Sequence, residues 1–245
     1  MGSRMRVLLQ TKSSSSSLLF LFPSFRISTL QHLRFASSRP NSHLRMAAAN
    51  SPQPPSSASV ANSSSSSSSA IDFLSLCHRL KTTKRAGWVK RDVKGPESIA
   101  DHMYRMGLMA LIMSDIPGVD RDKCVKMAIV HDIAEAIVGD ITPSDGVPKE
   151  EKSRRERDAL DQMCKLLGDG SRAKEIADLW MEYEENSSPE AKVVKDFDKV
   201  EMILQALEYE TDQGKDLDEF FQSTAGKFQT ELGKSWAAEI VRRRN

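Results

Sequence analysis

Three ionisable residues interrupt one apolar stretch of this chain. His131, Asp132 and Glu135 lie within residues 127–138, whose other members are all apolar. Such a composition predicts a largely buried helix, and burying a His, Asp or Glu without a partner costs several kcal/mol. Polar residues are retained in such a place where a metal ion or a hydrogen-bond network satisfies them. The stretch therefore predicts a helical core that contains a metal site.

The segments on either side of this stretch have helical periodicity. Apolar residues recur about every 3.6 residues over 71–81. Ser98 followed by Asp101 is typical of a capping box, which opens a helix to about residue 114, and Asp120 can cap the next helix. Turn residues separate further helical patterns at 148–167, 171–185, 188–211 and 217–241. Because no strand-like alternation is found, we predict an all-α fold, a single bundle of six to eight helices over residues 71–245.

Residues 1–70 differ in composition from the rest of the chain. They contain seven basic residues, no acidic residue and two serine tracts, at 13–17 and 63–69. Their apolar surface is too small to offset chain entropy, so we expect a disordered segment. An Arg- and Ser-rich N-terminus without acids is typical of a transit peptide, which predicts a chloroplast or mitochondrial location. The alternative is a disordered tail on a cytosolic protein, and Met46 could begin a shorter, untargeted form.

The remaining residues, 71–245, exclude two classes of partner. They hold 28 basic and 34 acidic residues, a net charge of −6. A mildly acidic body without a basic face is unsuited to a polyanion, so we expect no nucleic-acid partner. No stretch approaches the roughly 18 apolar residues of a membrane span, so we expect no membrane partner. The three cysteines form no CxxC pair and are expected to be reduced thiols.

The His-Asp-Glu stretch can supply only part of a metal site. In one continuous helix, His131 and Glu135 would share a face, because they are four residues apart, with Asp132 slightly displaced. Further ligands must come from other helices. His102 is one candidate, in the first turn of the preceding helix, and Asp198 is another, because it interrupts an apolar stripe.

Each of these two residues also has a simpler interpretation. His102 alone could be a hydrogen-bonded core residue, and Asp198 could pair with Lys195 or Lys199. Asp196 competes for any role given to Asp198. Polar residues that intrude into apolar stripes on separate helices are nevertheless better explained by one shared site than by independent accidents.

The spacing of His102, His131-Asp132 and Asp198 resembles the H…HD…D pattern of the HD superfamily of metal-dependent phosphohydrolases. Residues 130–135 and 139–143 are more specifically similar to the HD-domain 5′-deoxynucleotidases, in particular to the eukaryotic HD domain-containing protein 2 branch. Further segments that fit this branch are Arg85, 88–91, 96–98 and 148–152. The resemblance covers about residues 70–212.

The resemblance implies a metal site with a defined ligand set. His102, His131, Asp132 and Asp198 would hold a divalent ion, for which Mn²⁺, Co²⁺ or a similar transition metal suits the donors, with Mg²⁺ as an alternative. Because His131 is the last histidine of the chain, a second ion could be held only through oxygens. The donors of that second site would be Glu135, Asp140 and the carbonyl of Ile141, which suit a hydrated Mg²⁺.

The resemblance also implies roles in catalysis and substrate binding. Glu135 would be the general acid or base, and Asp140 would assist the leaving 5′-oxygen or bind the sugar. Arg85 would clamp the phosphate. Trp88 would wall the sugar or base, but Ala86-Gly87 separates it from Arg85, and a buried structural tryptophan is the alternative.

The implied reaction is the hydrolysis of deoxyribonucleoside 5′-monophosphates to deoxyribonucleosides and phosphate. Two alternatives remain: an HD phosphohydrolase that acts on other nucleotides, such as dNTPs or alarmones, and a non-catalytic module that binds a nucleotide. Apolar stripes at 180–183 and 204–209 leave room for a helix-paired homodimer, which the resemblance also suggests.

Overall fold

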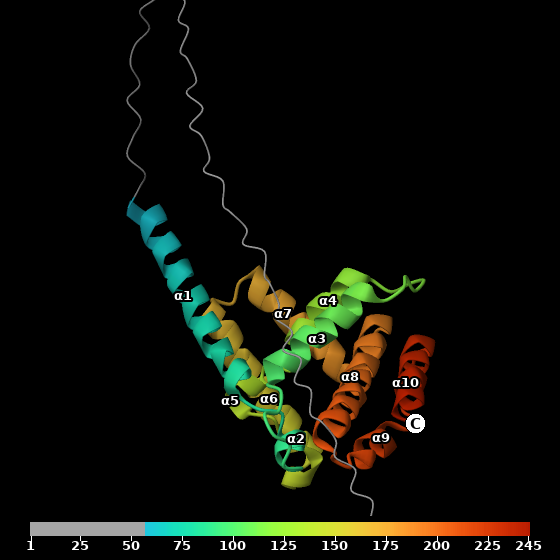
Figure 1. Cartoon of the computed structure of the whole chain (residues 1–245). Helices are drawn as coiled ribbons and strands as arrows, with labels where there is room; N and C mark the ends of the chain where they lie inside the picture. The colour runs from blue at the N-terminus through green and yellow to red at the C-terminus, as the bar shows by residue number, and fades with distance from the viewer. Residues whose placement is uncertain (1–56) are drawn as a thin grey trace, which may run out of the picture. The chain divides into compact units, whose positions relative to one another are not determined.

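The computed structural model describes residues 57–245, with side chains from Ser66 onward, and this part of the chain is helical without a strand (Figure 1). In chain order its elements are α1 (Ser57–Thr82), α2 (Ala86–Val89), α3 (Ile99–Ile112), α4 (Arg121–Val130), α5 (Glu135–Val138), the 3₁₀ turn η1 (Pro143–Asp145), α6 (Lys149–Leu167), α7 (Ser171–Glu185), α8 (Pro189–Gln213), α9 (Asp218–Thr224) and α10 (Glu231–Arg244). Eight of these α-helices have seven residues or more, and α2 and α5 are single turns of four residues. The prediction of an all-α bundle is confirmed.

Helix α1 begins earlier than its apolar pattern predicts. It starts at Ser57, so the boundary drawn at residue 70 lies inside the helix. Phe73 and Leu80 are buried and anchor its second half. Once such a segment is helical, each preceding residue adds a hydrogen bond without a new nucleation cost. Residues 1–56, which contain most of the predicted targeting segment, lie outside the described residues.

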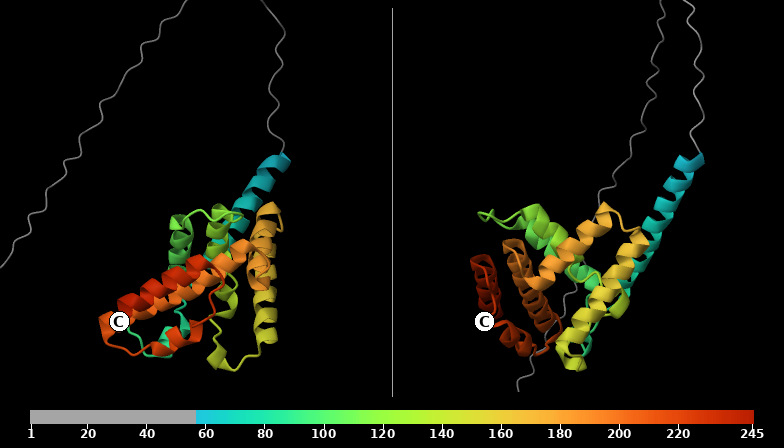
Figure 2. Two further views of the ribbon diagram at one scale, coloured as in Figure 1. Left: turned by 90° about the vertical axis from the view of Figure 1, so that its right-hand side faces the viewer. Right: turned by 180° about the vertical axis from the view of Figure 1, so that it is seen from behind.

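Helix α8 occupies the centre of the described bundle. It packs against α3, α4, α7, α9 and α10, while α1 packs against α3, α5 and α6. In Figure 1, α8 lies between α3 and α10, and Figure 2 shows α10 alongside it. Phe197, Val200 and Ile203 of α8 are almost fully buried. None of the described helices is both long and apolar enough to cross a bilayer.

The start of α3 is fixed by the predicted capping box. Ser98 Oγ accepts from the Asp101 amide at 3.2 Å, and Asp101 Oδ2 accepts from the Ser98 amide at 2.8 Å. The segment before α2 is tied to the same point, because the Arg85 amide donates to Glu97 O at 3.1 Å. These bonds place Arg85 beside the first turn of α3.

The expectation of one continuous helix over residues 127–138 was wrong. Helix α4 ends at Val130, and turns lead to Glu135, the first residue of α5. Within these turns the amides of Ile133 and Glu135 donate to carbonyls three residues earlier, those of Val130 and Asp132, at 3.0 Å each. A turn of this type has about three residues, so Asp132 and Glu135 come to the same side. Because of this tighter winding, His131, Asp132 and Glu135 all line one cavity.

Candidate metal centre

A cavity of about 750 Å³ collects the residues predicted from the sequence to form the site. Of the nine residues singled out there, eight line it: Arg85, Trp88, His131, Asp132, Glu135, Asp140, Ile141 and Asp198. The ninth, His102, is fully buried, and its Nε2 lies 3.4 Å from Asp198 Oδ1. The structure therefore brings together segments that are far apart in the chain.

The four predicted metal ligands converge on one point. One ligand atom each from His102, His131 and Asp198 lies within 4.8 Å of the other two. Asp132 adds a fourth, because its Oδ2 is 3.2 Å from His131 Nε2 and 3.8 Å from His102 Nε2. These residues come from α3, from the turns after α4, and from α8.

Each of the two histidines uses its Nδ1 in the core and leaves its Nε2 free to face the other candidate ligands. His131 Nδ1 donates to Ala128 O at 2.9 Å, and His102 Nδ1 lies 2.6 Å from Glu201 Oε2. Both Nε2 atoms are buried and make no hydrogen bond with any described residue. A buried ring nitrogen without a hydrogen bond is costly, and a divalent ion would satisfy both nitrogens together with the two aspartates beside them. The residues present fit a metal ion.

Glu201 is a functional candidate that the sequence interpretation missed. It is fully buried, three residues after Asp198 in α8, and also accepts from Arg105 Nε at 2.8 Å. A carboxylate on the far nitrogen of a histidine orients the ring and strengthens it as a ligand. Its signal in the sequence was a second carboxylate in the same apolar stripe as Asp198.

Proton and metal would compete for His102. Burial and Arg85 disfavour the charged imidazole, but Glu201 and Asp198 outweigh them and raise the pKa of His102 to about 9. A metal ion that binds Nε2 would therefore displace a proton at neutral pH.

The structure separates the roles of the two neighbouring aspartates. Asp196 is fully buried and accepts from the amides of Gln229 and Thr230, at 2.9 and 2.7 Å, so it holds the start of α10. Asp198 faces the cavity, where Tyr183 Oη donates to its Oδ2 at 3.1 Å. The alternative pairing of Asp198 with a lysine is not found among the described residues, since its ion pairs are with Arg85 and His102.

Arg85 lies against the ligand carboxylates. Its guanidinium nitrogens are 3.2 Å from Asp132 Oδ2 and 3.9 Å from Asp198 Oδ1. The positive charge offsets two carboxylates that burial would otherwise disfavour. The role of Arg85 as a phosphate clamp stays a prediction, and it would require the arginine to share its charge with the substrate.

Glu135 and Asp140 reach the cavity from either end of α5. Glu135 is 3% exposed, and its Oε2 has no hydrogen-bond partner among the described residues. Burial, with the negative charges of Asp132 and Asp140, raises the pKa of Glu135 well above its ordinary value. Asp140 Oδ2 accepts from the Ala86 amide at 2.6 Å. A buried carboxyl group with a raised pKa suits acid–base chemistry. The oxygen-only second metal site stays a prediction.

Trp88 is packed as a core residue. It is 2% exposed, its Nε1 donates to Glu97 Oε1 at 2.8 Å, and its ring contacts Tyr209 and Phe220. Because the polar atom and both flanks of the ring have partners, this packing favours the structural alternative over a wall for the sugar or base.

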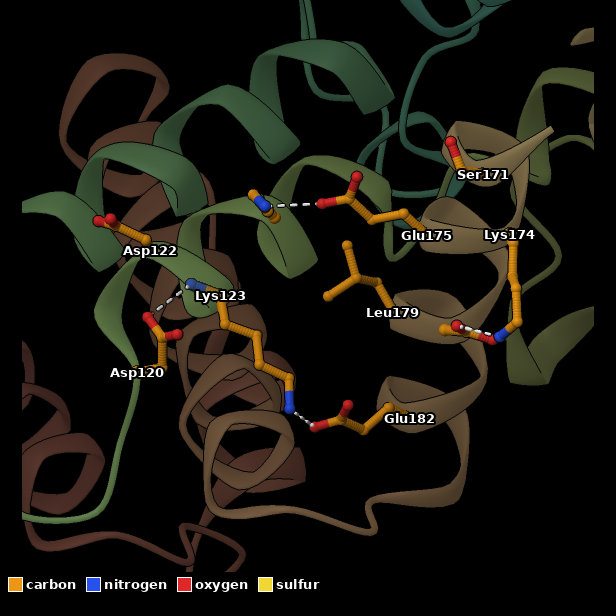
Figure 3. Close-up of a pocket in the computed structure, with 10 residues that line it drawn as sticks. Asp120, Asp122, Lys123, Ser171, Lys174, Glu175, Leu179 and Glu182 are labelled. Atoms are coloured by element: carbon orange, nitrogen blue, oxygen red, sulfur yellow. Dashed lines mark hydrogen bonds and ion pairs between the residues drawn. The ribbon is translucent and has the colours of Figure 1, made fainter.

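A second cavity, of about 440 Å³, lies between α4 and α7 (Figure 3). Six of its eight charged side chains pair with one another: Lys123 with Glu182 at 2.7 Å, Lys126 with Glu175 at 2.6 Å, and Lys174 with Asp178 at 2.6 Å. Since these charges are already matched, the surface ion pairs explain this cavity without a ligand.

We expect Glu201→Gln to weaken metal binding by about 10- to 100-fold, because the charged partner of His102 Nδ1 is lost. Isothermal titration calorimetry of the metal-free protein with Mn²⁺ or Co²⁺ measures this change in affinity. Glu208→Gln is the matched control, since Glu208 accepts from Arg105 at 2.7 Å without reaching His102. Equal metal affinity in the two variants would contradict the role assigned to Glu201.

Comparison with known proteins agrees with this arrangement. A family model described as HD domain matches residues 77–240. The 5′-deoxynucleotidase HDDC2 of Danio rerio is 56% identical over 160 residues, which cover 64% of this chain and 79% of the relative. The Homo sapiens protein of the same name is 53% identical over 162 residues, which cover 65% of this chain and 78% of that protein.

Solved structures show the same architecture. The PH0347 protein of Pyrococcus horikoshii OT3 superposes with a TM-score of 0.58 at 36% identity, covering 71% of this chain and 97% of that one. The HD domain-containing protein YGK1 superposes with a TM-score of 0.54 at 33% identity, and the match covers 72% of this chain and 85% of that one. The chain belongs to the HD domain family, as the H…HD…D spacing predicts.

Proposed function

We propose that this protein is a metal-dependent 5′-deoxynucleotidase, which hydrolyses deoxyribonucleoside 5′-monophosphates to deoxyribonucleosides and phosphate. One observation carries the proposal: two buried imidazole Nε2 atoms without a hydrogen-bond partner among the described residues face Asp132 and Asp198 at a large cavity. Glu135 lines the same cavity. The relatives named 5′-deoxynucleotidase support the choice of substrate.

The donor set favours a transition metal. Two imidazoles and two carboxylates suit Mn²⁺ or Co²⁺, whereas Mg²⁺ prefers oxygen donors and would fit the proposed site of Glu135, Asp140 and the Ile141 carbonyl. When bound, the ion would supply Lewis-acid activation of the phosphate and of a water molecule.

The protein's own groups position the substrate and move the proton. With its unpartnered Oε2 protonated, Glu135 would donate that proton to the leaving 5′-oxygen; ionised, it would instead accept a proton from the attacking water. Asp140, fixed by the Ala86 amide, would hold the sugar end. Arg85 lies against both carboxylates of the ligand set, and its positive charge partly offsets theirs.

The full-length protein with added Mn²⁺ or Co²⁺ should release phosphate from dNMPs in preference to NMPs and dNTPs. We expect Glu135→Gln to lower kcat by about 10²- to 10⁴-fold with its bound Mn²⁺ or Co²⁺ unchanged, because the proton-transfer group is removed and the ligands of that ion are kept. Phosphate release and bound metal are measured on the same samples, with Glu185→Gln, an exposed carboxylate of α7, as the control.

Two outcomes would contradict this proposal, and each would indicate a different function. Preferential hydrolysis of dNTPs or alarmones would identify an HD phosphohydrolase of another specificity. Binding of metal and nucleotide without turnover of any substrate would identify a non-catalytic nucleotide-binding module.

We also propose that the protein forms a homodimer, through a different surface from the stripes that the sequence offered. Trp180, Tyr183 and Tyr209 of those stripes are buried within one copy. On α3, in contrast, Tyr104 and Leu111 are 68% and 56% exposed and share a face. An exposed apolar face of this kind is typical of a protein interface, and a twofold axis can make it self-complementary. The α3 face is defined by Tyr104, Leu108, Leu111, Ile112 and the neighbouring Ile129 of α4.

We expect the wild-type protein to have twice the mass of one chain in solution and the double variant Leu108→Glu, Leu111→Glu to be monomeric. Charges placed on both positions would have to be desolvated in the interface. Light scattering coupled to size exclusion measures the mass. Val241→Glu, at another exposed aliphatic residue, is the control. A wild-type monomer, or a double variant that stays dimeric, would contradict the assignment.

We further propose that residues 1–70 direct the protein to a chloroplast or mitochondrion. The acid-free, Ser- and Arg-rich composition supports the proposal. A fusion of these residues to a fluorescent protein should enter one of the two organelles, and a fusion that starts at Met46 should stay in the cytosol. A cytosolic signal from the longer fusion would indicate an untargeted tail.

A further inference from the structure

Most of the basic side chains at the large cavity already have a negative partner. Eight basic residues line it, and five are ion-paired: Arg85 with Asp132, Lys90 with Asp145, Arg91 with Glu219, Lys152 with Glu156 and Lys199 with Asp196. Two others, Lys149 and Lys227, are exposed. The eighth, Lys195, is half-buried and forms no ion pair with any described residue.

Lys195 lies beside the ligand set. It precedes Asp198 by three residues in α8, and its Nζ is 3.9 Å from the centre of the Tyr183 ring. The hydroxyl of the same ring donates to Asp198 Oδ2 at 3.1 Å, and the ring centroid lies 4.9 Å from that of His131. One aromatic ring thus links the ammonium of Lys195 to two predicted metal ligands.

The surroundings of Lys195 leave its charge incompletely compensated. Burial lowers the pKa of Lys195, although the carboxylates of Glu184 and Asp198 act in the opposite direction. A cation over an aromatic face gains about 0.5–2 kcal/mol, which does not replace a hydrogen-bonded anion. An anion that enters the cavity beside Tyr183 would supply that missing partner.

We propose that Lys195 binds the phosphate group of the substrate beside the metal ligands. The proposal deepens the function proposed above, because a phosphate monoester brings up to two negative charges to this point. Arg85 is already shared between Asp132 and Asp198, so Lys195 is the half-buried cation at this cavity that forms no ion pair with a described residue. The ring of Tyr183, whose centre is 3.9 Å from Nζ, would hold the ammonium in place as a positioning residue.

The test uses inorganic phosphate as the probe and the full-length protein loaded with Mn²⁺. Lys195→Met keeps the aliphatic chain over the ring but removes the charge, so we expect phosphate binding to weaken by about tenfold or more. Lys195→Arg should restore binding, because its guanidinium keeps both the charge and the ring contact. Lys192→Met, an exposed lysine of the same helix, is the matched control.

Calorimetry gives the phosphate affinity, and steady-state kinetics on a dNMP should show a raised KM with kcat changed less, as for lost uniform binding. A loss of phosphate affinity below fivefold in Lys195→Met overturns the proposal. Lys195→Gln provides a second neutral variant if the Met variant has an altered thermal midpoint, and the same threshold applies to it.

Failure of this inference can be told apart from failure of the proposed function. Phosphate binding requires no turnover, so the titration decides the role of Lys195 even if no dNMP is hydrolysed. If dNMPs are hydrolysed and Lys195→Met binds phosphate like the wild type, the 5′-deoxynucleotidase proposal stands and the role of Lys195 is refuted.

Discussion

The burial of two imidazoles beside two half-buried carboxylates is the constraint on which the rest of this structure depends. None of these groups would be stable alone in an apolar core, so each needs partners that the backbone must deliver. The Nδ1 atoms of His131 and His102 are hydrogen-bonded to Ala128 O and to Glu201, respectively. Both Nε2 atoms are thereby left to face the candidate metal site. The capping box of α3, the tight turns after α4 and the central position of α8 all serve to bring these atoms to one point.

Helix α8 carries its candidate functional residues on one face and a structural carboxylate on another. Lys195 and Asp198 are three residues apart and both line the cavity, and Glu201, three residues further on, is buried against His102. Asp196 points away from the cavity and accepts hydrogen bonds from the amides of Gln229 and Thr230, directly before α10. At Gly233 of α10 an added Cβ would lie 2.5 Å from Asp196 Oδ2, so the close contact between these helices also depends on a glycine.

The sequence was sufficient for the main helices and for choosing the four candidate ligands that the structure brings together, because both rest on local signals. Ser98 and Asp120 cap α3 and α4 as predicted, and the polar interruptions of apolar stripes identify His102 and Asp198. The break after Val130 could not be predicted, because the stretch has no glycine or proline and its winding is set by tertiary contacts. Glu201 was missed for a related reason, since a glutamate in a charged helix is ordinarily solvent-exposed. The burial of Trp88 depends on Tyr209 and Phe220, which are distant in the chain.

The charge pattern of the cavity bears on which nucleotide fits it. Five of its eight basic side chains are neutralised by carboxylates of the protein itself, and Arg85 is held by two of the ligand residues. A triphosphate brings about four negative charges and would need several unpaired cations in one place. One half-buried lysine beside the candidate metal ligands, with two exposed lysines at the cavity, matches a single phosphate group better. Local compensation of charge, rather than the net charge of the chain, therefore favours a monophosphate in this site.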